Sequence, residues 1–166
     1  MYYINNFLIY SIFGFILEII ICFILKNPIN SGILYGPWTP VYGIGILIII
    51  FLNNKLKKYK KTKHYLLLFL FSFIILTFIE LIGGYLIEFT FNDIYWDYSA
   101  LPLHIGKYIS IEISLIWGLL SIIYVKYLKK FTDTISRYIP PIITIILFLA
   151  FITDFIITLI NKQKLF

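Results

Sequence analysis

Charged residues are scarce in this 166-residue chain, at 13% of the sequence, whereas hydrophobic residues make up 61%. Soluble globular domains carry about 25% charged residues, so the composition excludes that class. Apolar runs of about 18 residues or more are typical of membrane helices. The sequence therefore predicts an all-α, polytopic transmembrane helical bundle that forms a single integral membrane domain over residues 1–166.

Cysteine is almost absent, because Cys22 is the only one and it lies inside an apolar segment. This excludes an intramolecular disulfide and a cysteine-based metal cluster. The chain also lacks a phosphate-binding loop, a G-x-S-x-G nucleophile elbow and an HExxH zinc motif. We therefore expect no cofactor and no metal site, and the absence of a catalytic motif disfavours an enzyme without excluding one.

Arginine is equally rare, with Arg137 alone, so the net charge of +6 comes from lysine. The basic residues gather at 55–63 and 126–137, and loops of this kind face the cytoplasm. The charge therefore predicts orientation and not a nucleic-acid partner: we expect a multi-pass protein with a cytoplasmic N-terminus and an external C-terminus. His64 lies among the first group of lysines and is predicted to be a solvated loop residue.

Five apolar segments are predicted, at about residues 6–25, 41–53, 65–89, 106–127 and 139–160. The second would extend only about 20 Å, short of the roughly 30 Å hydrocarbon core. Residues 34–40 precede it and contain two prolines and a glycine, which exclude a regular helix. We predict a second span with a broken or re-entrant start, with a tight external turn as the alternative.

Four acidic residues lie well inside these segments, namely Glu18, Glu80, Glu112 and Asp154. An acid at mid-helix costs a few kcal/mol in a membrane, so it normally faces the bundle interior and marks a site. Under the predicted topology each acid lies roughly 9 to 15 Å below the external end of its segment. This predicts an acid-lined cavity that opens on the outer face. Neutral carboxyls that only hydrogen-bond helices together are the alternative.

The loop at residues 96–107 is polar and aromatic, and we predict that it forms the mouth of this cavity. Lys107 is expected to pair with Asp97 or to reach toward Glu112. Three roles are open for the His104 side chain: a proton carrier, a ligand or a hydrogen-bonding loop residue. A metal site of His104, Asp97 and a glutamate also stays open, although no spacing matches a metal motif.

Several motifs extend across these segments and loops. They are Gly14-Phe15-Ile16-Leu17-Glu18, the stretch from Asn30 to Gly45, Glu80 to Gly84, Glu88, Trp96-Asp97-Tyr98-Ser99, His104 to Ile109, and Trp117-Gly118. Together they resemble the ABC-transporter type IV (CmpB-like) family of small bacterial membrane proteins over about residues 10–130. The fifth segment and Asp154 lie outside this resemblance. The chain departs from the family pattern at Phe15 for Trp, Ser31 for Arg, His104 for Asn and Lys107 for Arg.

The resemblance implies a transporter permease in a bacterial plasma membrane. We predict a permease-like protein whose outer cavity binds a cation, a proton or a small polar solute, embedded in the lipid bilayer as a homo-oligomer or with a separate ATPase subunit. A membrane-embedded enzyme acting on lipid or envelope material and a non-catalytic accessory or assembly subunit are the alternatives. The cavity residues are predicted to be Glu18, Glu80, Glu88, Glu112, Tyr35, Trp38, Tyr42, Trp96, Asp97, Tyr98, His104 and Lys107.

Overall fold

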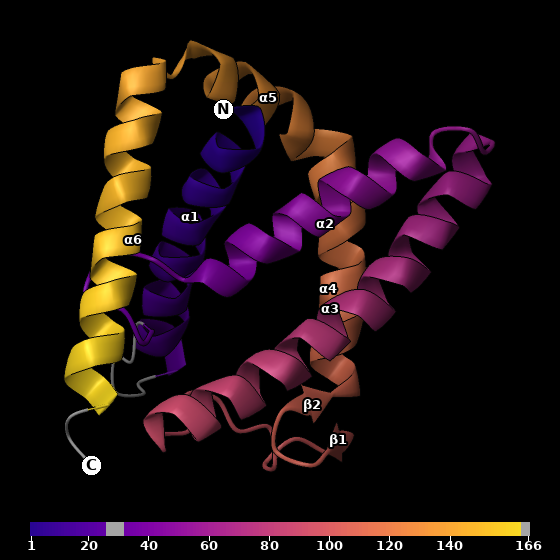
Figure 1. Cartoon of the computed structure of the whole chain (residues 1–166). Helices are drawn as coiled ribbons and strands as arrows, with labels where there is room; N and C mark the ends of the chain where they lie inside the picture. The colour runs from indigo at the N-terminus through magenta and orange to yellow at the C-terminus, as the bar shows by residue number, and fades with distance from the viewer. Residues whose placement is uncertain (26–31, 164–166) are drawn as a thin grey trace. The chain divides into compact units, whose positions relative to one another are not determined.

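The computed structural model describes residues 1–25 and 32–163. Residues 26–31, which include Lys26 and the motif positions Asn30 and Ser31, and residues 164–166 lie outside the described parts. The elements, in chain order, are helices α1 (Tyr2–Leu25), α2 (Pro40–Leu56) and α3 (Lys61–Phe91), strands β1 (His104–Ile105) and β2 (Ile109–Ser110), helix α4 (Ile111–Ile123), π-helix η1 (Tyr124–Leu128), and helices α5 (Lys129–Tyr138) and α6 (Pro141–Gln163) (Figure 1).

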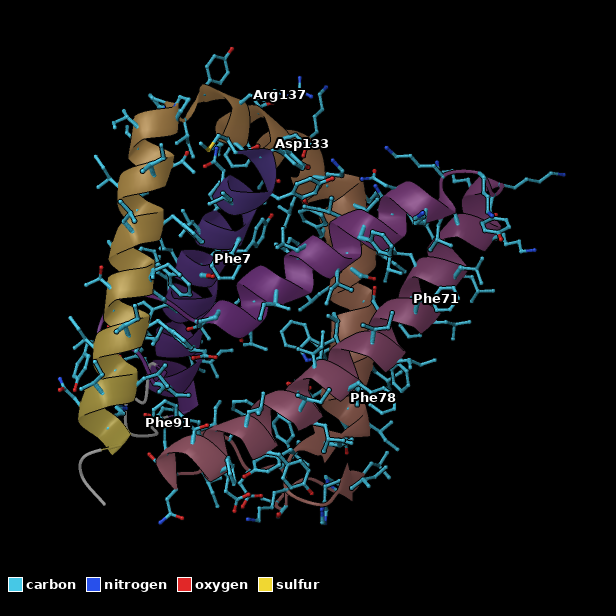
Figure 2. The ribbon with its side chains drawn as sticks, in the orientation of Figure 1. Phe7, Phe71, Phe78, Phe91, Asp133 and Arg137 are labelled. Carbon is cyan, nitrogen blue, oxygen red and sulfur yellow. The ribbon has the colours of Figure 1, made fainter. Side chains whose placement is uncertain are left out.

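Within the described residues, four helices are long and apolar enough to cross a membrane, at Tyr2–Ile24, Lys61–Phe91, Ile111–Tyr138 and Pro141–Lys162. The third of these consists of α4, η1 and α5 in succession. The wider π-helical turn of η1 lies between α4 and α5, and the helix continues through it. Phe71 and Phe78 point outward from α3 (Figure 2) and are exposed, as expected for side chains that contact lipid. These features confirm the predicted helical membrane bundle.

The second apolar segment is a shorter helix than its neighbours. α2 has 17 residues, which corresponds to about 25 Å at 1.5 Å per residue. It begins at Pro40, because proline fits the first turn of a helix, where its missing N–H has no partner to lose. Residues 32–39 before it form no helix or strand, in agreement with the predicted break. Whether this segment enters the membrane stays a prediction.

The chain divides into two compact units, one of Met1–Ile44 with Asp133–Phe166 and the other of Gly45–Thr132. In the first unit, α1 packs against α6, and Leu8, Trp38 and Phe151 form a buried apolar cluster. Gly43 makes a close approach to α1 possible, because a methyl group there would collide with Ser11 and with Phe7.

Polar contacts join the start of α1 to α5 and α6 in the same unit. The Tyr2 hydroxyl donates to the Asp133 carboxylate at 2.5 Å. The Asn5 amide donates to the Ser136 carbonyl at 2.8 Å, and its oxygen accepts from the Thr144 hydroxyl at 2.5 Å. Asn5 and Thr144 are almost fully buried, so these bonds satisfy polar groups that would otherwise be costly in an apolar environment.

The second unit is built on the packing of α3 against α4. Every fourth residue of α3 from His64 to Gly84 is buried, which places these side chains on one ridge of the helix. On the facing helix, Gly118 lies against the Phe69 ring, and the Thr77 hydroxyl donates to the Ser114 hydroxyl at 2.6 Å. The loop between α3 and α4 contains the short antiparallel pair β1–β2.

Two sequence predictions are wrong in this unit. The fourth segment was expected to begin at Gly106, but α4 begins at Ile111, because Gly106 has φ +65° and turns the β1–β2 hairpin. Glu112 therefore lies in the first turn of the helix and not at its middle. His64 is not a solvated loop residue, because it lies in the first turns of α3 with 8% of its surface exposed.

Candidate functional site

The loop after α3 is fastened to that helix by two glutamates. Glu88 accepts from the Lys107 ammonium at 2.6 Å and from the Tyr108 hydroxyl at 2.7 Å. The first contact is an ion pair of partly exposed side chains. Lys107 therefore pairs with Glu88 and not with either of its two predicted partners, Asp97 and Glu112. Because the two donors are consecutive in sequence, one carboxylate fixes this part of the loop.

Glu80 lies two turns earlier on the same helix and is 5% exposed. The Tyr98 hydroxyl donates to one of its oxygens at 2.9 Å, and the side chain of Trp117 also faces its carboxyl from α4. A buried carboxyl in an apolar helix pair needs such donors. The contact brings together one motif of the third span, one of the loop and one of the fourth span.

Two glycines of α3 give the loop aromatics room to approach. A methyl group on Gly84 would lie 2.5 Å from the Tyr108 ring, and one on Gly83 would lie 3.6 Å from Trp96. The rings of Trp96 and Tyr108 meet edge to face at 6.1 Å. Tyr108 is 2% exposed, so this part of the loop packs closely against α3.

The other end of the loop is fastened by Glu112. Its carboxylate accepts from the Ser110 hydroxyl at 2.6 Å and from the Leu103 backbone N–H at 3.1 Å. Ser110 also accepts from the Ile113 N–H and caps α4. A carboxylate at a helix N-terminus is favoured by the helix dipole. Glu112 therefore closes the hairpin onto the start of α4.

Charges in the loop are shifted by these same contacts. The Ser99 hydroxyl and backbone N–H lower the pKa of Asp97 below its ordinary value. The hydrogen bond to Glu88 raises the pKa of Lys107. Burial, followed by the bond to Glu88, raises the pKa of Tyr108 to about 12. Near neutral pH the loop thus carries a carboxylate, an ammonium and a neutral phenol.

In the first unit, two acids contact the irregular segment before α2. The Thr39 side chain faces the carboxyl of Glu18 from the start of that helix. Asp154 on α6 accepts from the backbone N–H groups of Tyr35 and Gly36, at 3.1 and 2.8 Å. Each acid therefore helps to hold residues 35–39 against a long helix.

An open recess of about 870 Å³ lies beside Asp154. It is lined by residues 35–38 and by one face of α6, namely Ala150, Thr153, Asp154, Ile157 and Asn161. Asp154 is one of the four acids predicted to be buried, but it is not among the predicted cavity residues. The polar face that it shares with Asn161 on α6 was the available signal.

The predicted site residues fall into two groups, one in each unit. Glu80, Glu88, Trp96, Tyr98 and Lys107 come together where α3 meets its loop. Asp97 and His104 are exposed on that loop, and Glu112 lies at its far end. His104 Nδ1 is 3.0 Å from the Gly106 carbonyl, the contact expected of a hydrogen-bonding loop residue. The loop residue Tyr108 was missed, because no spacing pattern predicts its contact with Glu88.

In the first unit, the three predicted aromatic residues differ in exposure. Tyr35 is 64% exposed, whereas Trp38 is 6% exposed in the core cluster. Tyr42 packs so closely on α1 that a methyl group on Gly14 would collide with its ring. Tyr35 and Trp38 both line the recess. Among the described residues, no group of three His, Cys, Asp or Glu side chains is placed to hold a metal ion.

A family model described as "Putative ABC-transporter type IV" matches residues 5–159. The chain belongs to this family. The match confirms the resemblance but extends it, because the fifth apolar segment and Asp154, expected to lie outside, are inside the matched range. Neither the curated proteins nor the solved structures gave a match. The contacts of Asp154 therefore belong to the matched region of this type IV family, as do those of Glu18, Glu80, Glu88 and Glu112.

Proposed function

We propose that this chain is the permease-like membrane subunit of an ABC-type transporter, and that its acid-bearing loop attachments bind a cation, a proton or a small polar solute. Membership of the type IV family supports the transporter class. The sequence has no phosphate-binding loop, so ATP hydrolysis of that kind would come from a separate subunit. The proposed setting is a bacterial plasma membrane with the N-terminus in the cytoplasm and the two loop motifs outside.

The observation that carries this proposal is Glu80. Its carboxyl lies in the apolar α3–α4 pair, is nearly buried, and is contacted by Tyr98 of the loop. Ionisable groups within membrane helices are costly and commonly belong to solute or proton pathways. The Tyr98 contact links this carboxyl to the loop that we propose as the mouth. Movement of that loop would therefore change the surroundings of Glu80 directly.

The first test is purification of the full chain from native membranes in a mild detergent. Recovery of an ATPase subunit supports the proposal. The recovered complex is then placed in vesicles with ATP, and uptake of rubidium, methylammonium and protons is measured. We expect Glu80→Gln to abolish at least one flux that the wild type supports, while Asp93→Asn leaves it unchanged. Asp93 is a fair control because it is exposed and its carboxylate accepts from the N–H of the adjacent Ile94.

A second candidate is supported by the same hydrogen bonds. The carboxylates of Glu88, Glu112 and Asp154 each accept from loop donors, as expected if the acids mainly hold the structure together. The chain would then be a non-catalytic accessory subunit. In that case deletion of the chain lowers the amount of a partner protein in the membrane, and Glu80→Gln leaves every flux intact in a folded complex.

A further inference from the structure

We propose that the recess beside Asp154 is a binding site for a small alkylammonium cation, an assignment that rests on the proposed function in that this cation would be a solute of the permease. The recess is formed entirely within the first unit, by residues 35–38 and one face of α6. It contains one carboxylate, several apolar side chains and two aromatic rings.

The carboxylate is oriented but its charge is not neutralised. Asp154 Oδ1 accepts from the Tyr35 N–H at 3.1 Å and from the Thr158 hydroxyl at 3.3 Å, and Oδ2 accepts from the Gly36 N–H at 2.8 Å. A carboxylate offers about four acceptor positions, so one position on Oδ2 is left for a ligand. In the chain at residues 1–25 and 32–163, no basic side chain forms an ion pair with Asp154.

Gly36 keeps this oxygen accessible to the recess. A methyl group at Gly36 would lie 2.9 Å from Asp154 Oδ2 and would collide with the Trp38 indole nitrogen. The absence of a side chain therefore lets the backbone N–H, the carboxylate and the indole edge meet at one point. Any larger residue there would fill the space that we assign to the ligand.

The walls decide the class of cation. Tyr35 forms an exposed lip and Trp38 a buried base, and Pro37, Ala150 and Ile157 add apolar surface. Aromatic faces attract ammonium groups, most strongly where water is excluded. A divalent metal ion would need more oxygen ligands than one carboxylate supplies. Carboxylate, aromatic lip and apolar wall together fit a cation that carries alkyl groups.

The test measures binding of radiolabelled trimethylammonium, which carries one N–H for the open position on Oδ2, to the full chain in maltoside micelles by equilibrium dialysis. We expect saturable binding that neutral tert-butanol does not displace. Asp154→Asn should weaken binding by about tenfold or more, because the ligand loses a charged partner. Tyr35→Leu should weaken it by about fivefold. Tyr138→Leu is the matched control, since Tyr138 is also an exposed tyrosine but lies on α5, and it should bind like the wild type.

The Tyr35 variant guards against misfolding, because its exposed ring can be removed without opening the core. Binding no greater than in protein-free micelles, or equal binding by the wild type and Asp154→Asn, overturns the proposal. Displacement by micellar phosphatidylethanolamine but not by phosphatidylglycerol assigns the site to a lipid headgroup, and absence of displacement assigns it to a free amine. If the chain binds the cation but no ATPase co-purifies with it, the permease proposal is refuted and the cation site stands. If an ATPase co-purifies but the cation does not bind, the cation site is refuted and the permease proposal stands.

Discussion

Gly84 on α3 lies so close to the Tyr108 ring that the smallest added side chain should loosen the loop. A methyl group at this position would be 2.5 Å from Cγ and Cδ1 of the ring and 2.9 Å from Cδ2. These atoms are the inner part of a ring that is 2% exposed and bonded to Glu88. The ring therefore cannot turn aside without leaving its pocket or breaking that bond.

The expected magnitude follows from two opposing effects of Gly84→Ala. Overpacking a tight contact costs about 1–3 kcal/mol, whereas replacing a helical glycine by alanine contributes about 0.5–1 kcal/mol. The clash should win, and the net loss of about 1 kcal/mol corresponds to a fall of about 2–4 °C in the unfolding temperature. The measurement is thermal unfolding of the purified chain in detergent.

Gly83→Ala is the matched control, because the same substitution one residue earlier meets only Trp96 at 3.6 Å, an ordinary contact. It should leave the unfolding temperature unchanged or raise it slightly. The double variant Gly84→Ala/Tyr108→Ala removes the clash, so the alanine at 84 should cost nothing in that background. The reasoning is refuted if Gly84→Ala is as stable as Gly83→Ala, or if its cost persists without the ring.

Three further substitutions test the same unit. Thr77→Val removes the hydroxyl that donates to Ser114 and should lower stability by about 0.6 kcal/mol, the average for hydrogen bonds between membrane helices. Thermal unfolding measures it, and the loss should be smaller in a Ser114→Ala background, where the Thr77 hydroxyl still donates to the Phe73 carbonyl. Tyr98→Phe leaves a buried carboxyl oxygen without its phenol donor and should cost about 1–3 kcal/mol by the same assay; an unchanged unfolding temperature would contradict the assigned bond. The pKa of Asp97 is lowered in the folded chain. Its carboxylate therefore stabilises the loop at pH values above its ordinary pKa of 3.8, and this stabilisation is lost as the pH falls through the lower pKa of the folded chain. Hydrogen exchange at the Ser99 N–H should therefore gain protection from acid to neutral pH in the wild type but not in Asp97→Asn.

The positions of the loop contacts could not be predicted from sequence. The four-residue spacing of Glu80, Gly84 and Glu88 places them on one side of a helix, and in the structure Glu80 and Gly84 are buried on α3. Spacing says nothing about which loop residues reach that face. Lys107 reaches Glu88 because the β1–β2 hairpin reverses the chain direction at Gly106. Strands of two residues are too short to give a periodic pattern in the sequence, so this hairpin could not be predicted.

Composition and apolar run length alone determined that this chain is a helical membrane protein, because about 20 apolar residues in succession are stable in few other settings. The motifs together were enough to indicate the type IV family. The tertiary structure decided which partners the acids have. Glu112 is a residue of the first helical turn, His64 is buried, and Asp154 binds the backbone of residues 35 and 36. These outcomes depend on contacts between segments far apart in the chain, and the free energy of such contacts is not encoded in any local pattern.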